Sequence, residues 1–581
     1  MKPSQHRSQH SALAPQQPRW TAHAAIGTLI ALFLLVLCLG FVLGWNASAA
    51  EADELQQAPE TRQSSAGQAP ELGRKSEASE ERAETSENNI RFVSRAAAPE
   101  PPPGGGEPLP PAVSTSLRRL IYPEEFEGGE GASDPAAARR FVHLAASKAF
   151  RPAWAPGDAD PTARRWDLSD TLHRFVDWMD LDPGEHQLKV PVGHDQERYI
   201  ALRLPPDYDP ARPWPLLILY HYSGGTGREF LGYAQRLLGQ ERADQFVLAA
   251  PTFYRQTTLD APPPYTAEHP LMLRALRQVA HVDSDRVYTL GVSLGGYTTW
   301  TLAKVHADRY ASAVSISAVY DPVADVEGMW ELMAPNAAHI PVLHAWGYHD
   351  RFPVRGFQGE GPNAGTMREL NRRFSPLIED LGLQVLEYRD GRSGHTGVLP
   401  PGKMLDEIFA HRRVHAPRQV RHHFRHLHQA RAYWLEGLAW HGDAWTGRRP
   451  AEPKIDPKTG KKETQGQAYA RVYLPLLGLL EGHIEGQTIQ VESLHLDDLI
   501  VWFGEDSIDW SQPVTLMHRG RTVFTGLLQP DPLVAITQAR RSLDFDRLRW
   551  AGLRLQNVES GEISVSLVDV DTDLPVVPGA G

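Results

Sequence analysis

The residue in this sequence with the clearest capacity for covalent chemistry is Ser293, which lies in a Gly-x-Ser-x-Gly turn. An apolar run of strand character, 285–290, precedes the turn, and a helical pattern over 297–303 follows it. Small residues on both sides of the serine let a strand and a helix approach closely, and the tight turn presents the hydroxyl at the edge of a sheet. A serine held in this way can attack an electrophilic carbon once a base removes its proton. The pattern therefore predicts a nucleophile.

The carboxylate that would complete this chemistry is predicted at the end of a later strand. Residues 340–347 indicate a buried strand that runs into a loop, and Asp350 stands in that loop, closely followed by an apolar residue and a proline. A carboxylate there can hold a catalytic imidazole in one tautomer and stabilise its protonated form. Asp321 is the alternative, because it also ends a predicted strand, 311–317.

The base is expected to be His395, which follows the last predicted strand of this region, 383–388, in a Gly-His pair. It comes after the serine and the aspartate in chain order, as the fold of such a turn requires. Its imidazole would take the serine proton and return it to the leaving group. The sequence holds 25 histidines, so position rather than residue type supports this choice. Structural or surface positions are expected for His344, His349 and His411.

Backbone donors for the developing oxyanion are predicted in a glycine-rich loop. A buried strand over 215–221 feeds the sequence Tyr222-Ser223-Gly-Gly-Thr-Gly, well before the nucleophile. We expect the N–H group of Tyr222 or Ser223 to act together with that of Leu294, the residue after the serine. Each such donor is typically worth ~3 kcal/mol of the barrier.

These motifs together resemble a known family. Leu-Pro-Pro-Asp-Tyr-Asp-Pro over 204–210, Pro-Leu-Leu-Ile-Leu-Tyr-His over 215–221 and Asp-Arg-Val-Tyr over 285–288 look like the exported bacterial esterase and depolymerase branch of α/β-hydrolases. That branch includes enzymes similar to polyhydroxybutyrate depolymerases and feruloyl esterases, and it is similar to the catalytic domain of prolyl oligopeptidase-type peptidases. The resemblance covers about 184–413. It implies a mostly parallel sheet with helices on both faces and a Ser-His-Asp hydrolase without cofactor or metal.

One position departs from the family pattern. Tyr222 stands where the family usually has glycine, directly after the histidine of the oxyanion loop. The leading hypothesis is hydrolysis of small-molecule or polymeric carboxylic esters through an acyl-enzyme. The alternatives are a peptidase of prolyl oligopeptidase type, for which no propeller sequence is evident, and an inactive surface-binding protein.

Two long loops are expected to form the mouth of the site. Residues 251–270 carry Phe253, Tyr254 and Tyr265, and residues 321–340 carry Met329, Trp330 and Met333. These side chains suggest an apolar or aromatic acyl pocket, although packing against one another is an equal alternative.

The N-terminal part predicts export. Residues 24–45 are apolar and uncharged, about the length that spans a bilayer, and basic residues before them with acidic residues after them place the N-terminus in the cytoplasm. This segment is either an uncleaved single-pass anchor or a signal that is cleaved, leaving a secreted or periplasmic protein. The expected organisation is a cytoplasmic basic segment 1–23, the apolar segment 24–45, a disordered linker 46–115, a helical extension 116–183, a catalytic domain 184–413 and a β-rich domain 414–581.

The C-terminal domain is predicted as a small β-sandwich with one helix near 535–543, because short strand-like runs alternate with turn residues. Residues 418–431 hold His422, His423, His426 and His428. A zinc site is conceivable, but a solvated strand and turn is the favoured interpretation, since no acidic or cysteine partner stands at ligand spacing. The net charge of −12 argues against a nucleic-acid partner. The sequence leaves the oligomeric state open.

Overall fold

The computed structural model describes Leu117, 167–176, 178–179, 181–193, 196–253, 264–320, 328–354, 365–442 and 451–569. The predicted segments 1–23, 24–45 and 46–115 lie outside these residues. In the described part of the chain, no helix is both long enough and apolar enough to cross a membrane.

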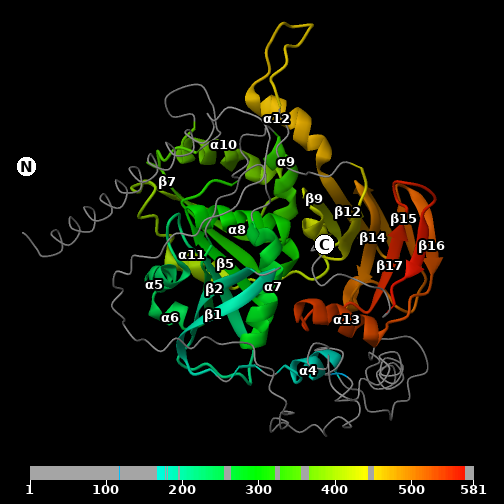
Figure 1. Ribbon diagram of the computed structural model, residues 1–581, viewed down its shortest axis with the longest axis horizontal. Coiled ribbons are helices and arrows are strands. Elements are labelled where there is room, and N and C mark those ends of the chain that lie inside the picture. Colours follow the sequence, from blue (N-terminus) through cyan, green and yellow to red (C-terminus); the bar gives the residue numbers. More distant parts are fainter. Residues whose placement is uncertain are drawn as a thin grey trace, which may run out of the picture. The chain divides into compact units, whose positions relative to one another are not determined.

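The first half of the described chain is built on an eight-stranded sheet with the order β1-β2-β4-β3-β5-β6-β7-β8. Figure 1 labels β1, β2, β5 and β7 of this sheet. Strands β1 and β2 pair antiparallel, β2 joins β4 antiparallel, and every later pair is parallel. The predicted mostly parallel sheet is therefore confirmed. The strands are Gly184–Gly193, Gln196–Leu204, Trp214–Tyr220, Val247–Pro251, Val282–Val292, Ser312–Ile316, Val342–Gly347 and Val385–Asp390.

Helices cover both faces of this sheet, as the alternating side chains of β3 show: successive residues pack against helices on opposite faces. Leu217 and Leu219 pack with the helices α5 and α11, whereas Leu216, Ile218 and Tyr220 belong to a second cluster that includes side chains of α7, α8 and α10. Successive side chains of a strand point to opposite faces, so one apolar run serves both layers. The helices are α5 Gly227–Leu238, α6 Gln240–Ala243, α7 Pro264–Val279, α8 Leu294–Val305, α9 Met329–Met333, α10 Met367–Asp380 and α11 Gly402–Phe409.

Three expected segments differ in the structure. In the predicted helical extension 116–183, the described helix is α4, Leu168–His173, which ends before Phe175 and Met179. The expected loop 251–270 is partly helical because α7 begins at Pro264. The expected loop 321–340 likewise contains α9 and a 3-10 turn, Ala334–Ala337.

The C-terminal part forms two five-stranded sheets, with the orders β10-β11-β14-β17-β18 and β16-β15-β13-β12-β9. All described pairs are antiparallel except β13 with β15. Two further helices are α12, Gln465–Tyr473, and α13, Pro532–Ser542, which lies near the predicted helix at 535–543. The strands are β9 Gln419–Phe424, β10 Arg431–Ala432, β11 Leu435–Trp440, β12 Gly478–Glu485, β13 Thr488–Leu494, β14 Leu496–Phe503, β15 Val514–His518, β16 Arg521–Gly526, β17 Ala551–Gln556 and β18 Ser564–Leu567.

Buried charges join the C-terminal sheets to the first sheet. The Arg413 guanidinium, fully buried, donates to Asp544 over 3.1 Å and to Asp285 over 2.9 Å. Arg547 donates in the same way to Asp308, 2.9 Å away. Moving a charged side chain out of water into the protein interior is costly unless the charge is paired. Separation of the C-terminal sheets from the first sheet would break these ion pairs, so the pairs favour the packed arrangement.

The histidine-rich strand β9 is solvated only at Gln419 and Arg421, contrary to the sequence interpretation of a solvated strand. His422 and His423 are buried, and burial lowers the pKa of each to about 4. The Asn336 side chain forms two hydrogen bonds with the backbone of His423: it donates to the carbonyl over 2.7 Å and accepts from the N–H over 2.8 Å. The burial of these two imidazole rings therefore depends on the segment that packs against β9 and not on how polar the residues of β9 are.

Candidate active site

Ser293 lies between β5 and α8 in a strained backbone conformation, with φ 56° and ψ −116°. A Cβ at Gly291 would stand 2.1 Å from the carbonyl oxygen of Gly295, and one at Gly295 would stand 1.9 Å from that of Tyr220. Only glycine fits such close backbone approaches. The Ser293 N–H donates to the Ile316 carbonyl of β6 over 2.8 Å, so the neighbouring strand holds the turn in place. Strain of this kind is typical of a nucleophile that must project from a sheet.

The structure brings Ser293, His395 and Asp350 together. The Ser293 Oγ lies 2.9 Å from the His395 Nε2, and the His395 Nδ1 lies 3.0 Å from the Asp350 Oδ2. An ionised carboxylate only accepts, so the imidazole proton belongs on Nδ1 and Nε2 is left to accept the serine hydroxyl. Asp350 is 0 % exposed, and its Oδ1 accepts the Phe352 N–H over 3.0 Å. This arrangement can remove the proton from Ser293.

Contacts between the loops after β7 and β8 set this geometry. A Cβ at Gly347 would stand 2.0 Å from the Gly394 carbonyl oxygen, so the backbones of the two loops are in direct contact at this point. The His349 N–H donates to the Ser393 carbonyl over 3.0 Å, and the Arg368 N–H of α10 donates to the Asp350 carbonyl over 3.0 Å. The acid and the base are therefore fixed to one another before any substrate arrives.

The oxyanion loop is fixed by His221, a residue that sequence reasoning missed. The Phe253 N–H donates to the His221 Nε2 over 3.2 Å, so the imidazole proton lies on Nδ1, which donates to the Tyr222 carbonyl over 2.7 Å. Burial lowers the pKa of His221 and keeps it neutral. The C=O and N–H of a trans peptide point in opposite directions. The N–H of Ser223 consequently points away from His221 and is not used by this clamp.

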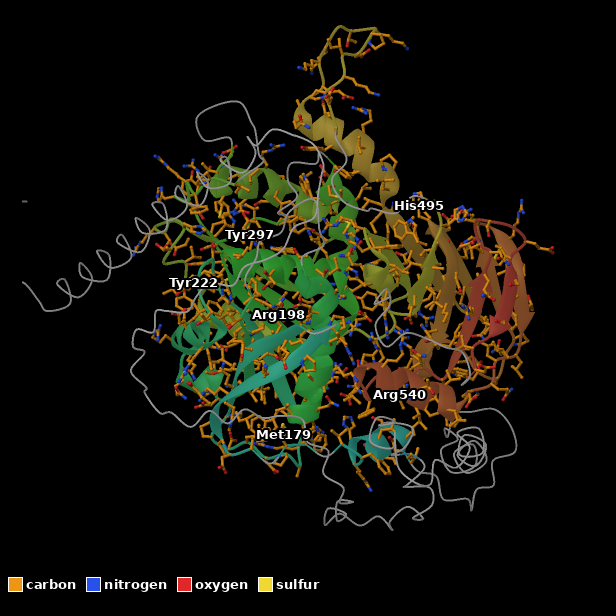
Figure 2. All side chains as sticks on the ribbon, viewed as in Figure 1. Met179, Arg198, Tyr222, Tyr297, His495 and Arg540 are labelled. Carbon is orange, nitrogen blue, oxygen red and sulfur yellow. The ribbon has the colours of Figure 1, made fainter. Side chains whose placement is uncertain are left out.

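The Tyr222 ring, which replaces the glycine of the family pattern, packs towards α5. Its centroid lies 6.1 Å from that of Phe230 and 6.4 Å from that of Tyr233, both edge to face, and the residue is 39 % exposed (Figure 2). The substitution therefore adds an aromatic surface beside the loop, and the Tyr222 carbonyl still accepts the Gly225 N–H over 3.1 Å. Leu294, whose N–H is the other expected oxyanion donor, is the first residue of α8. N–H groups at the start of a helix have no partner within the helix and favour negative charge.

Other candidates fall elsewhere. Asp321 lies outside the described residues. His344 is buried, accepts the Trp300 indole N–H over 3.0 Å and lies 3.1 Å from the Asn371 side-chain oxygen, so it is structural as expected. His349 and His411 are exposed.

The side chains expected to line an acyl pocket are mostly committed to packing. Met329 and Met333 are buried in a cluster with Tyr473, Leu476 and Leu477. Phe253 stacks on His221 with centroids 4.2 Å apart, and Trp330 packs near Tyr320 and Phe374. Tyr254 and the side chain of Tyr265 lie outside the described part of the structure.

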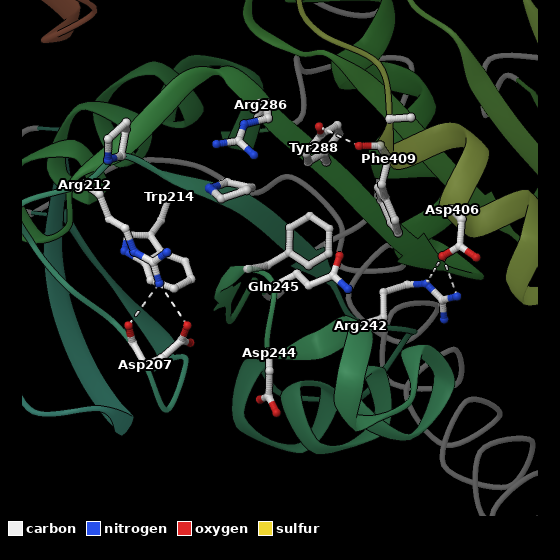
Figure 3. Close-up of a pocket in the computed structure, with 14 residues that line it drawn as sticks. Asp207, Arg212, Trp214, Arg242, Asp244, Gln245, Arg286, Tyr288, Asp406 and Phe409 are labelled. Atoms are coloured by element: carbon white, nitrogen blue, oxygen red, sulfur yellow. Dashed lines mark hydrogen bonds and ion pairs between the residues drawn. The ribbon is translucent and has the colours of Figure 1, made fainter.

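A cavity of about 500 Å³ lies at the opposite edge of the sheet (Figure 3). Trp214, which lines it, begins β3, whereas Tyr220 at the other end of β3 pairs with Gly291 beside the nucleophile turn. An aromatic floor that includes Phe246 and Tyr288 is rimmed by ion pairs such as Arg242 with Asp406. This cavity is remote from Ser293 and takes no part in its chemistry. Among the described residues, no group of three or more His, Cys, Asp or Glu side chains could hold a metal ion.

Comparisons with known proteins found a family match and similar solved structures. Residues 271–336 match the model of the prolyl oligopeptidase family. Similar solved structures include a thermostable esterase, at 20% identity over 39% of this chain and 63% of that one with a TM-score of 0.29. Others are a ferulic acid esterase from Anaeromyces mucronatus, at 12% identity over 41% and 94% with a TM-score of 0.29, and Porphyromonas gingivalis dipeptidyl peptidase 4, at 15% over 40% and 36% with a TM-score of 0.30.

At these TM-scores the structural similarities say nothing about the activity of this chain. The matched region spans less than two thirds of the esterase and about a third of the peptidase. The comparison with curated protein sequences found no match. The sheet order, the strained serine between β5 and α8, and the family match over 271–336 together identify the chain as a member of the α/β-hydrolase superfamily.

Proposed function

We propose that this protein hydrolyses carboxylic esters with a Ser293, His395 and Asp350 triad. The observation that supports it is the continuous hydrogen-bonded line from the Ser293 Oγ through both ring nitrogens of His395 to the Asp350 carboxylate. That line ends on a carboxylate shielded from water. A fully buried carboxylate that accepts a backbone N–H and an imidazole N–H can stabilise an imidazolium without being protonated itself.

Acylation follows from this geometry. The Ser293 Oγ bonds to the acyl carbon while its proton passes to the His395 Nε2, and the N–H groups of Ser223 or Tyr222 and of Leu294 receive the oxyanion. The bond from the acyl carbon to the alcohol oxygen then breaks, and the same proton goes from Nε2 to the departing oxygen. Water, deprotonated by His395, releases the acid and restores the serine.

The decisive experiment is labelling with a fluorophosphonate probe, followed by mass mapping and by hydrolysis of simple esters. We expect Ser293 to carry the label in the folded protein and both labelling and turnover to be lost in Ser293→Ala and His395→Ala. Full ester hydrolysis by a Ser293→Ala protein would show the assignment to be wrong. A folded protein that labels nowhere would favour the inactive surface-binding alternative, which the Tyr222 position motivates.

A peptidase is the second candidate, because the family match over 271–336 is to the prolyl oligopeptidase family. The described C-terminal part forms two five-stranded sheets, which differ from the four-stranded blades of a propeller. Matched ester and amide substrates with the same acyl group distinguish the two activities. We expect turnover of the ester alone, and comparable turnover of the amide would favour the peptidase.

Export is part of the proposal, on the basis of the apolar segment 24–45 and the charges on either side of it. The catalytic residues would then work on the outer side of the cytoplasmic membrane, on small or polymeric esters. Cell fractionation of the full-length chain, with N-terminal sequencing of the mature protein, decides between an anchored and a cleaved form. Recovery of the whole protein in the cytoplasm would contradict export.

A further inference from the structure

The Phe352 side chain lies beside the triad and takes no part in the acylation and deacylation steps. Its ring stacks on the His395 imidazole, with centroids 4.4 Å apart and an interplanar angle of 19°. Its backbone N–H donates to the Asp350 Oδ1. The same residue therefore contacts both the acid, through its backbone, and the base, through its side chain.

The ring is not buried by these contacts. Phe352 is 39 % exposed, and the His395 side chain beside it is 21 % exposed. Ligand sites are lined mostly by apolar and aromatic side chains around a few polar groups, and an exposed ring in contact with the His395 imidazole fits that description. Part of the Phe352 ring covers the imidazole, and the exposed part can contact a molecule that binds beside His395.

The chemistry of the triad identifies which part of the substrate that is. His395 must hand its proton from Nε2 to the departing alcohol oxygen, so the alcohol portion of the ester has to lie beside the imidazole. The acyl portion is held by its carbonyl at the oxyanion donors near Ser223 and Leu294. A ring stacked on the imidazole therefore borders the alcohol side of the site.

We propose that Phe352 forms the wall of the leaving-group subsite and selects esters whose alcohol carries a flat apolar ring. This inference rests on the proposed ester hydrolysis. Aromatic rings favour offset-stacked or edge-to-face contact with other rings, worth about 0.5–1.5 kcal/mol beyond the area they bury. Tyr348, four residues earlier in the same loop, is 41 % exposed and lies under the Arg368 guanidinium at 4.7 Å, so the loop offers a second aromatic surface.

The test compares the hydrolysis of benzyl acetate with that of ethyl acetate by the purified full-length protein. Both esters form the same acetyl-enzyme and release alcohols of similar acidity, so kcat/KM differs between them only through the alcohol. We expect Phe352→Leu to lower kcat/KM for benzyl acetate about two- to twelvefold relative to that for ethyl acetate, the factor that corresponds to the ring contact. Phe352→Tyr keeps the ring and should retain the wild-type ratio of the two esters.

The outcomes separate this inference from the proposed function. An equal fall in kcat/KM for both esters in Phe352→Leu would mean that the ring only supports His395. Full activity with an unchanged ratio of the two kcat/KM values would mean that the alcohol does not touch the ring. Either result overturns the subsite. Fluorophosphonate labelling of Ser293 in wild type and Phe352→Leu checks that the nucleophile remains active. Absence of both labelling and turnover in the folded wild-type protein would overturn the ester hydrolysis itself, and the subsite with it.

Discussion

His221→Phe is expected to damage the oxyanion loop while preserving its packing. A phenyl ring can keep the stack on Phe253, which has centroids 4.2 Å apart, but it loses both hydrogen bonds of the imidazole. The buried Phe253 N–H then loses the hydrogen bond to His221, at a cost of about 1–3 kcal/mol in the free energy of unfolding. The Tyr222 carbonyl keeps only the Gly225 N–H, so the peptide that carries the Ser223 N–H is free to turn.

Loss of one oxyanion donor raises the barrier by ~3 kcal/mol, which corresponds to about a 100-fold fall in kcat/KM. The assay is ester hydrolysis alongside equilibrium unfolding in denaturant. His344→Phe is the matched control, because His344 is also buried and hydrogen-bonded on both nitrogens but lies in the middle of β7. We expect the control to lose stability with little change in rate. A His221→Phe protein that is destabilised yet keeps kcat/KM within about twofold of wild type would refute the reasoning, since a lost donor should cost far more.

Three further predictions follow from the same structure. Asp350→Asn should keep the fold but lower kcat by about 10⁴-fold, because an amide favours the wrong imidazole tautomer; near wild-type turnover would exclude the Asp350 role. Acidification should destabilise the fold. Burial lowers the pKa of His281 and of His422 to about 4 in the folded protein, whereas the same imidazoles in the unfolded chain bind protons from about pH 6.5 downwards. The free energy of unfolding from denaturant titrations should therefore fall from about pH 6.5 to about pH 4, and a flat profile would contradict the burial of these rings. Arg413→Met should lower it by about 1.5–3 kcal/mol, since Asp544 loses its charge-assisted hydrogen bonds to Arg413 and keeps the longer ion pairs with Arg277 and Arg547, at 3.7 and 3.9 Å. In that variant, activity and far-UV circular dichroism should be lost in one transition, whereas two separate transitions would mean that the C-terminal sheets fold independently.

The sequence by itself located the strands that carry the nucleophile, the acid and the base, in their order along the chain. Ser293 could be placed in a strand-turn-helix because local glycines and apolar periodicity require no distant partner to be recognised. The strands that carry Asp350 and His395 were found in the same way, and the eight-stranded sheet has the predicted parallel character. The short alternating runs of the C-terminal part correspond to strands of two sheets, and α13 lies close to the helix expected near its end.

Only the tertiary structure decided which side chains meet. A strand end predicts where a loop begins but not how the chain turns within it, so the 3.0 Å contact between Asp350 and His395 depends on the backbone approach of Gly347 to Gly394. The stack of Phe352 on His395 and the hydrogen bond from the Phe253 N–H to His221 likewise join residues of separate loops. Burial of His422 and His423 contradicted the expectation from composition, because the segments that cover β9 lie far away in the chain. Local pattern specifies secondary structure, whereas contact between distant loops is fixed by packing that no single stretch of sequence encodes.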